Sequence, residues 1–173
     1  LVPGSGGVRG IGILMNRVFD EIEIFENAPI ETWFGVGGRA DRLCRPSSPW
    51  ALIRCLEEHE TVRVLGDGAN LLVADDGVDG LVVDLDTPGF RKTSIDPASG
   101  LVVAGAGARL PSLINETVRA GLTGLEVLAG IPASVGGAVV MNAGGKIGEI
   151  ADVVRAVEAL DRHADRVRLD RGA

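Results

Sequence analysis

The sequence predicts an α+β fold in which short strands and short helices do not alternate as regular βαβ units. Apolar residues recur at helical spacing after Ser48-Pro49, and short β-branched runs at 62–65, 81–85 and 101–104 have the length of strands. No helix is predicted between residues 62 and 104, so these strands follow one another directly. This order disfavours a simple Rossmann fold and favours a mixed α+β domain.

Composition restricts the class of protein. The 173 residues carry a formal net charge of -7, and no run of lysine and arginine is longer than two residues, which argues against nucleic acid or an anionic membrane as a partner. No apolar run approaches the ~20 residues of a membrane-spanning helix, and the start of the chain lacks a signal-peptide core. Cys44 and Cys55 have no metal-site or CxxC spacing. We therefore expect reduced, buried thiols in a cytoplasmic protein and no metal site.

The chain is predicted to begin with an N-terminal arm, residues 1–26, that includes a short helix near 13–24. One domain is expected over residues 27–173, with two sub-lobes at about 27–88 and 89–173.

In the first sub-lobe, Ser48 as N-cap and Pro49 at the first helical position predict a helix over 49–59. Its apolar stripe is Leu52, Cys55 and Leu56. Strands are expected on both sides of this helix, at 42–45, 62–65, 71–73 and 81–85.

In the second sub-lobe, a turn at 96–100 precedes a strand at 101–104. Pro111 opens a helix that Gly121 ends, and a short glycine-containing helix follows Ser134. The expected inner face of the first of these helices is Leu113, Ile114, Thr117 and Val118. A closing hairpin is predicted at 153–160 and 167–169.

Glycine clusters provide the first functional signal, because 25 glycines gather at a few places in the chain. The loop 66–70, Gly-Asp-Gly-Ala-Asn, leaves a strand, and its successive N–H groups could form a concave site for phosphate. The side chain of Asp67 should then point away from that phosphate. An ordinary β-turn explains this loop about equally well.

The segment 124–144 carries a stronger signal. Ser134 caps a helix whose first N–H groups, around residues 135–137, should form a positive end, and Gly136 and Gly137 should let a ligand approach the backbone. The apolar run 138–141 is expected to pack inward. The alternative is a glycine-rich helix that packs closely on a neighbour without a ligand.

Four motifs, in order and at matching spacing, resemble the UDP-N-acetylenolpyruvoylglucosamine reductase (MurB) family. They are Thr-Trp-Phe-Gly-Val-Gly-Gly-Arg-Ala-Asp at 32–41, Leu-Gly-Asp-Gly-Ala-Asn-Leu-Leu at 65–72, Val-Ala-Gly-Ala-Gly-Ala-Arg-Leu at 103–110, and the glycine-rich segment 124–144. The resemblance implies the FAD-binding fold of the vanillyl-alcohol oxidase (PCMH) type, with FAD between two α+β lobes.

By the same resemblance, loop 66–71 holds the FAD pyrophosphate, 130–137 lines the diphosphate and ribityl chain, and 142–144 approaches the isoalloxazine ring. The implied FAD-binding residues are Gly66, Asp67, Gly68, Ala69, Asn70, Leu71, Gly130, Ile131, Pro132, Ser134, Val135, Gly136, Gly137, Asn142, Ala143 and Gly144. The sequence departs from the family pattern where Ala69 replaces a usual Ser, where Ala133 replaces a usual Gly, and around Lys146, to which no role is assigned.

The implied activity is the NADPH-dependent, FAD-mediated reduction of UDP-N-acetylglucosamine enolpyruvate to UDP-N-acetylmuramate in peptidoglycan precursor synthesis. FAD is expected to bind non-covalently, since no His or Cys is placed for covalent attachment. The family's catalytic Arg, Ser and Glu are expected beyond residue 173, so no catalytic residue is assigned and this chain alone is expected to be inactive. Two alternatives stay open: a FAD-linked oxidase of the same fold, and a non-catalytic flavin-binding fragment. The sequence predicts no oligomeric state.

Overall fold

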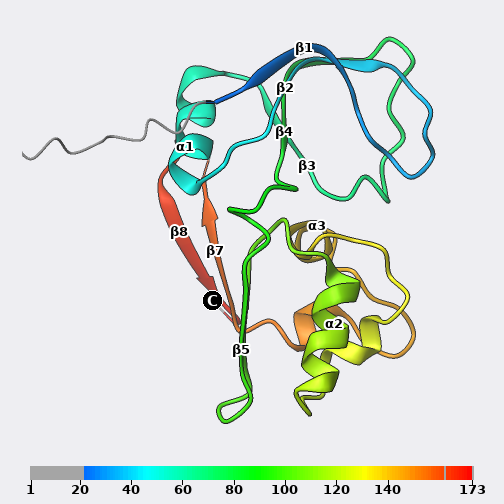
Figure 1. Cartoon of the computed structure of the whole chain (residues 1–173), viewed down its shortest axis with the longest axis vertical. Coiled ribbons are helices and arrows are strands. Elements are labelled where there is room, and N and C mark those ends of the chain that lie inside the picture. The colour runs from blue at the N-terminus through cyan, green and yellow to red at the C-terminus, as the bar shows by residue number, and fades with distance from the viewer. Residues whose placement is uncertain (1–21, 162, 173) are drawn as a thin grey trace, which may run out of the picture.

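The computed structural model describes residues 22–161 and 163–172, and Figure 1 shows their arrangement. The first part, which we call the sheet lobe (residues 24–84), is a four-stranded sheet of order β1-β2-β4-β3. Its strands are β1 (Ile24–Pro29), β2 (Arg39–Cys44), β3 (Val62–Leu65) and β4 (Val78–Asp84). β1 pairs antiparallel with β2, whereas β2 and β3 both run parallel to the central β4.

Helix α1 (Pro49–Glu58) makes the crossover between the parallel strands β2 and β3. It begins as the sequence predicted, because the Ser48 side-chain oxygen accepts a hydrogen bond from the Ala51 amide at 3.2 Å. α1 packs on the sheet through Cys55, which joins Leu81 of β4 and Cys44 of β2 in one core cluster. Both cysteines are free and buried, as predicted, and their sulfur atoms lie 3.3 Å apart.

The connection from β3 to the parallel strand β4 is an extended loop over residues 66–77, which meets the length of about a dozen residues that a parallel connection needs. The strand predicted at 71–73 is wrong. Instead of pairing with a strand, this loop is held against the loop between β1 and β2 by two backbone hydrogen bonds. Trp33 N–H donates to the Gly68 carbonyl, and Gly38 N–H donates to the Ala74 carbonyl.

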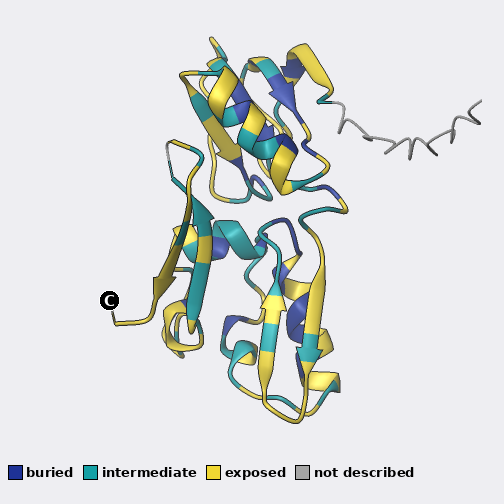
Figure 2. Cartoon of the chain, turned by 90° about the vertical axis from the view of Figure 1, so that its left-hand side faces the viewer, coloured by how far each residue is buried: buried dark blue, intermediate teal, exposed yellow. Residues whose placement is uncertain are grey.

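The second part, which we call the helical lobe (residues 93–154), packs short helices around a separate core. The β5–β6 hairpin (Thr93–Asp96 and Leu101–Ala104) leads into α2 (Leu110–Arg119). The single-turn helix η1 (Leu125–Leu128), α3 (Val135–Val140) and η2 (Ile150–Asp152) follow. Their buried core is Leu110, Ile114, Leu128, Ala138 and Ile150. Figure 2 shows buried segments inside both lobes, so each lobe has a core of its own.

A final antiparallel hairpin, β7 (Ala156–Leu160) and β8 (Arg166–Asp170), confirms the predicted closing hairpin. Figure 1 shows that this hairpin extends from the helical lobe toward α1. At that end, the Arg166 guanidinium lies 5.7 Å from the centroid of the Trp50 ring, within range of a cation–π interaction. The hairpin thereby connects the two lobes at a point remote from their direct contact.

Further predictions about elements were wrong. Ile24, the last residue of the helix predicted near 13–24, begins strand β1, and residues 22–23 are not helical. The rest of that helix and most of the predicted arm, residues 1–21, lie outside the described residues. Val118 of α2 and Val140 and Met141 of α3 are exposed rather than inward, because α3 buries only the side on which Ala138 lies. The division into sub-lobes at residue 88 stays a prediction.

Leu81 gives a test of the sheet-lobe core. It is fully buried in β4, so we expect Leu81→Ala to lower the free energy of unfolding by about 2–5 kcal/mol. Leu101→Ala in β6 is the matched control, because Leu101 is 48% exposed, and we expect a loss below about 1 kcal/mol there. Urea unfolding followed by circular dichroism measures both values. Equal losses would contradict the placement of Leu81 in the core.

Candidate functional site

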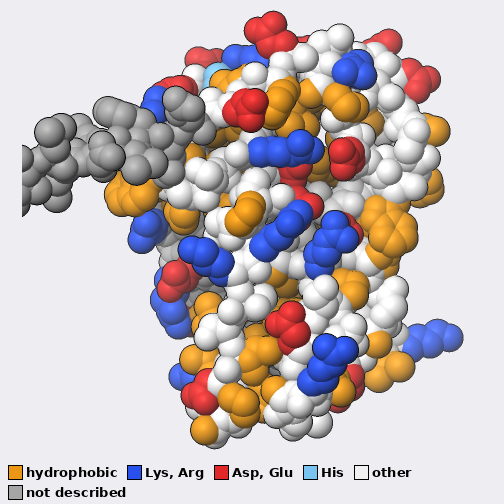
Figure 3. Space-filling view, in the orientation of Figure 1, with side chains coloured by type: hydrophobic (Ala, Val, Ile, Leu, Met, Phe, Trp, Pro, Cys, Tyr) orange, Lys and Arg blue, Asp and Glu red, His pale blue; other side chains and the backbone are white. Residues whose placement is uncertain are grey.

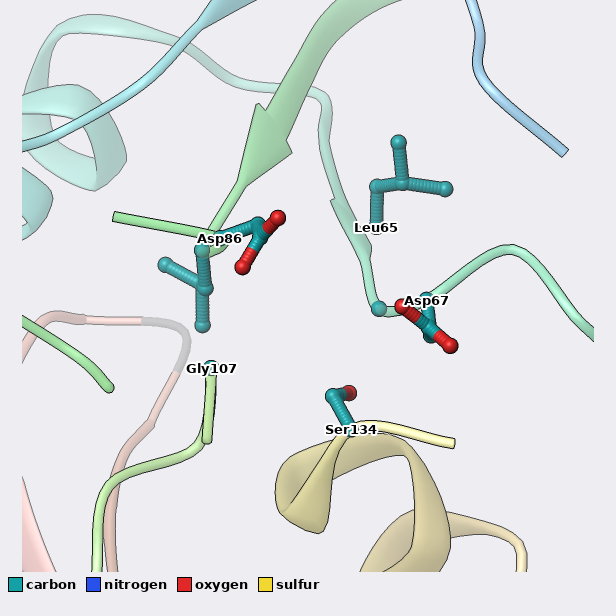
Figure 4. A pocket seen from close by; sticks show the side chains of 7 residues that line it. Leu65, Asp67, Asp86, Gly107 and Ser134 are labelled. Carbon is teal, nitrogen blue, oxygen red and sulfur yellow. The ribbon is translucent and has the colours of Figure 1, made fainter. Parts of the chain in front are cut away.

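A small pocket lies where the two lobes meet (Figure 4). The sheet lobe contributes residues from the ends of β3 and β4, and the helical lobe contributes Gly107 and the capping residue of α3, Ser134. The complete lining is Leu65, Gly66, Asp67, Leu85, Asp86, Gly107 and Ser134. Figure 4 shows Asp67 and Ser134 on facing sides of the pocket.

The pocket owes its place to the parallel pairing of β3 with β4. Leu65 lies opposite Asp84 in the register, so both strands end at the same edge of the sheet. In open sheets of parallel strands, ligands bind in the crevice outside the carboxyl ends of the strands. Sequence reasoning found Gly66 and Asp67 but missed Asp86. The signal for Asp86 was its position directly after the apolar run 81–85, at a strand end.

Loop 66–70 begins at this crevice, where Gly66 and Asp67 line the pocket. Within the part of the chain that the structure describes, the N–H groups of residues 66–70 donate no hydrogen bond to the protein. The loop is fixed from behind, since Gly68 has a φ of +66° and a Cβ there would lie 2.4 Å from the Glu31 carbonyl oxygen. A row of unsatisfied, partly exposed amides at a strand end suits an anionic group such as a diphosphate.

The amides at the start of α3 donate hydrogen bonds inside the protein, so the helix end predicted at 135–137 has its N–H groups engaged by protein acceptors. Val135 N–H donates to the Ala108 carbonyl at 2.8 Å, Gly136 N–H to the Ala106 carbonyl at 2.8 Å, and Gly137 N–H to the Ser134 hydroxyl at 3.2 Å. A Cβ on Gly136 would lie 2.8 Å from the Ala106 Cβ. Close packing on residues 106–108, one of the alternatives that the sequence left open, therefore accounts for this glycine.

The other residues singled out by the sequence lie farther along the helical lobe. Residues 142–144 follow α3, at the end of the helix opposite Ser134. There the Asn142 side-chain oxygen accepts a hydrogen bond from the Ala151 amide at 3.3 Å, and Gly144 pairs with Glu149. Both interactions stabilise the turn before η2. Residues 130–132 form the connection between η1 and α3.

Arginine and aspartate side chains form ion pairs beside the pocket, near the place where the two lobes meet. Figure 3 shows lysine and arginine side chains gathered across the middle of one face, with acidic side chains between them. Arg45 Nε lies 2.8 Å from an Asp84 carboxylate oxygen, and Arg91 donates a hydrogen bond to Asp86. A second cation, Arg109, has its guanidinium 3.8 Å from Asp86. The hydrogen bond from Arg91 and, to a smaller extent, the charges of Arg91, Arg109 and Arg45 hold the pKa of Asp86 below its ordinary value of 3.8.

Other candidate groups have structural partners. The Glu126 carboxylate accepts a hydrogen bond from the Gly124 amide, and His59 Nδ1 lies 3.3 Å from the Arg42 guanidinium. Among residues 22–161 and 163–172, no cluster of His, Cys, Asp and Glu could hold a metal ion. In the same residues no helix has both the length and the apolar character needed to cross a membrane.

A family model described as an FAD binding domain matches residues 48–170. The chain belongs to the FAD binding domain family. FAD is therefore its cofactor. The residues at the crevice fit this cofactor, because the N–H groups of loop 66–70 can donate hydrogen bonds to a diphosphate and two glycines keep side chains out of that loop.

This FAD-binding domain is similar to several proteins named UDP-N-acetylenolpyruvoylglucosamine reductase. One from an Anaeromyxobacter species is 47% identical over 142 residues, which is 79% of this chain and 44% of the relative. Another, from Moorella thermoacetica, is 44% identical over 82% of this chain and 47% of its own length. The chain thus spans about half the length of the curated relatives it matches.

Solved structures confirm the predicted fold type. The crystal structure of UDP-N-acetylenolpyruvylglucosamine reductase from Thermus caldophilus has a TM-score of 0.69 and 39% identity, covering 87% of this chain and 52% of its own. That of 6-hydroxy-D-nicotine oxidase from Arthrobacter nicotinovorans has a TM-score of 0.65 and 19% identity, covering 91% of this chain and 37% of its own. The second likeness shows the shared fold alone.

The ion pairs of Asp86 should make stability depend on pH. Because folding lowers the pKa of Asp86, its charge stabilises the folded state above the unfolded pKa, and this contribution is lost as the pH falls through the folded pKa. We expect Asp86→Asn to destabilise the protein most at about pH 7, and the difference from the parent to shrink below about pH 4.

Urea unfolding of the parent and of Asp86→Asn over this pH range measures the effect. Asp76→Asn, on an exposed turn, makes the same change in net charge and serves as the control. A difference between parent and Asp86→Asn that stays constant with pH would contradict the ion-pair assignment.

Proposed function

We propose that this domain binds FAD non-covalently across the crevice between the two lobes, with the diphosphate on the amides of loop 66–70. The observation that carries the proposal is the run of N–H groups without an internal acceptor, placed where β3 ends and opposite Ser134. Gly66 is central to this arrangement, because a Cβ there would lie 2.9 Å from the Ser134 hydroxyl oxygen and would narrow the crevice.

The proposed contacts differ in kind along the cofactor. Residues 66–71 would bind through backbone N–H groups, whereas Val135, Gly136 and Gly137, whose amides are engaged, would contact FAD through carbon surface. Residues 130–132 would line the ribityl side. Residues 142–144 would border the isoalloxazine ring, with Asn142 holding the turn rather than bonding to the ring.

We further propose that the protein acts as a UDP-N-acetylenolpyruvoylglucosamine reductase that uses NADPH to form UDP-N-acetylmuramate, with this chain as its N-terminal, FAD-carrying part. The support is the 47% identity to a protein of that name over most of this chain. When bound, FAD supplies hydride transfer between the nicotinamide and the enolpyruvyl group. The share of this chain is to hold the cofactor, and no residue of it is assigned a proton-transfer role. The two free, buried thiols suit the cytoplasm, which we propose as its location.

Acid precipitation tests the mode of FAD binding. We expect the purified protein, loaded with FAD, to release all of its flavin into the supernatant when it is denatured with acid. Absorbance at visible wavelengths and mass spectrometry of the pellet measure the two fractions. Flavin that remains attached to the precipitated chain would contradict non-covalent binding.

Gly66→Ala tests where the cofactor lies. We expect its added methyl group to lower the affinity for FAD about 10-fold, because it occupies the crevice beside Ser134, while the melting temperature of the apoprotein changes little. Gly145→Ala is the matched control, since a Cβ at that position meets no atom within 4 Å. Flavin fluorescence titration gives the affinities. Equal affinities for both variants and the parent would place FAD elsewhere.

Activity assays distinguish the proposed reductase from the two alternatives, a FAD-linked oxidase and a non-catalytic flavin-binding module. The relatives are about twice as long as this chain. For a protein of that full length that contains this chain, we expect NADPH oxidation that depends on the enolpyruvyl sugar nucleotide. This 173-residue chain, loaded with FAD, should show none. Oxygen-dependent formation of peroxide with a hydroxy acid or alcohol would favour an oxidase instead, and binding of FAD without either reaction in the longer protein would favour a non-catalytic flavin module.

A further inference from the structure

The arginines beside the pocket differ in how firmly carboxylates hold their guanidinium groups. Arg45 contacts the buried carboxylate of Asp84, whose side chain is 10% exposed, and Arg91 donates a hydrogen bond to Asp86. Arg109 has only a longer contact of 3.8 Å to Asp86, and its side chain is 62% exposed. Two aspartates are thus shared by three arginines, and Arg109 is the cation held least tightly.

Backbone pairing places Arg109 beside the pocket. Arg109 and Ser134 face each other in an isolated antiparallel bridge, flanked by the hydrogen bonds from Leu110 N–H to the Ala133 carbonyl and from Val135 N–H to the Ala108 carbonyl. This is the non-hydrogen-bonded type of pair, in which the two Cβ atoms are close and on the same face. Since the Ser134 side chain lines the pocket, the Arg109 side chain starts from the same side.

The residues that line the crevice include no cation that could pair with a diphosphate. Asp67 and Asp86 both line the pocket and are acidic, and loop 66–70 offers amides but no cation. Arg91 already neutralises Asp86 through a direct hydrogen bond. Arg109 is therefore the cation beside the pocket whose guanidinium is least engaged by a carboxylate.

We propose that Arg109 is a binding residue for the FAD diphosphate: its guanidinium moves from its long contact with Asp86 to donate hydrogen bonds to a phosphate oxygen held on loop 66–70. Asp86 positions Arg109 in the free protein. This inference rests on the proposed FAD site, and it adds a side chain outside the glycine-rich motifs. It makes Arg109 specific for the diphosphate part of the cofactor, without a role at the flavin ring.

Arg109→Gln and Arg109→Lys test this role in the full chain. The probes are FAD, riboflavin (which has the ring but no phosphate) and ADP (which has the diphosphate but no ring). We expect Arg109→Gln to weaken FAD and ADP binding about 10-fold or more, as for loss of a charge-assisted hydrogen bond. Riboflavin affinity should not change. The variant should also lose part of the salt dependence of FAD binding, because one charge pair is removed.

Arg119→Gln, which removes an exposed arginine from the opposite end of α2, is the control and should bind all three probes like the parent. Arg109→Lys keeps the charge and should recover part of the affinity for FAD and ADP, which a purely structural role would not explain. Fluorescence titrations at several salt concentrations, with a thermal melt of each apoprotein, give these values.

The outcomes separate the two proposals. If the parent binds neither FAD nor ADP, the proposed cofactor site is wrong and the assignment of Arg109 is wrong with it. If the parent binds FAD, and Arg109→Gln binds it equally well with the same salt dependence, only the assignment of Arg109 is overturned. Equal loss of FAD and riboflavin affinity would also overturn it, because that result would indicate a general effect on the crevice.

Discussion

Direct contact between backbone segments at the lobe boundary is the constraint on which the crevice depends. A Cβ on Gly107 would lie 2.0 Å from the Leu85 carbonyl oxygen, so the chain after β6 can lie against the end of β4 only with glycine there. The same stretch then accepts the amides of Val135 and Gly136 through the carbonyls of Ala108 and Ala106. A side chain at position 107 would push residues 106–108 away from Leu85 and would move α3 with them. Ser134 would then no longer face the end of β3. The position of the α3 cap is thus fixed by backbone geometry.

Ion pairs complete this contact without adding apolar surface. Arg45 and Asp84 belong to the sheet lobe, Arg109 belongs to the helical lobe, and Asp86 and Arg91 lie on the segment that joins them. The pairs of Asp86 are half-exposed, and pairs of this kind each contribute about 1 kcal/mol or less. The separate apolar core of each lobe supplies the stability, and the charged side chains at the boundary stay near enough to water to interact with an anion.

Local signals in the sequence were sufficient to predict helices α1, α2 and α3 and the turn at 66–70. Ser48 and Ser134 each cap the helix they were expected to cap, and both side-chain oxygens accept the predicted kind of hydrogen bond. Features that depend on distant residues were missed. β1 exists because β2 pairs with it, and the amides of Val135 and Gly136 are engaged because residues 106–108, about 30 positions earlier, lie beside them. Arg109 lies beside the pocket only through its bridge pairing with Ser134, which no local pattern indicates.

The two walls of the crevice differ in how firmly they are held, and this difference bears on how a ligand can act. On the helical lobe, Ser134, Ala108 and Leu110 are buried, and the backbone bonds from Leu110 N–H to the Ala133 carbonyl and from Val135 N–H to the Ala108 carbonyl hold them together. On the sheet lobe, loop 66–77 is held by a few backbone bonds to its neighbour, and Leu72 is 75% exposed. Segments with little buried apolar surface open at low free-energy cost. A diphosphate that accepts hydrogen bonds from the loop amides would therefore stabilise the loop by mass action. In the proposed complex, the helical lobe would set where the cofactor lies, and the cofactor would hold the loop in place.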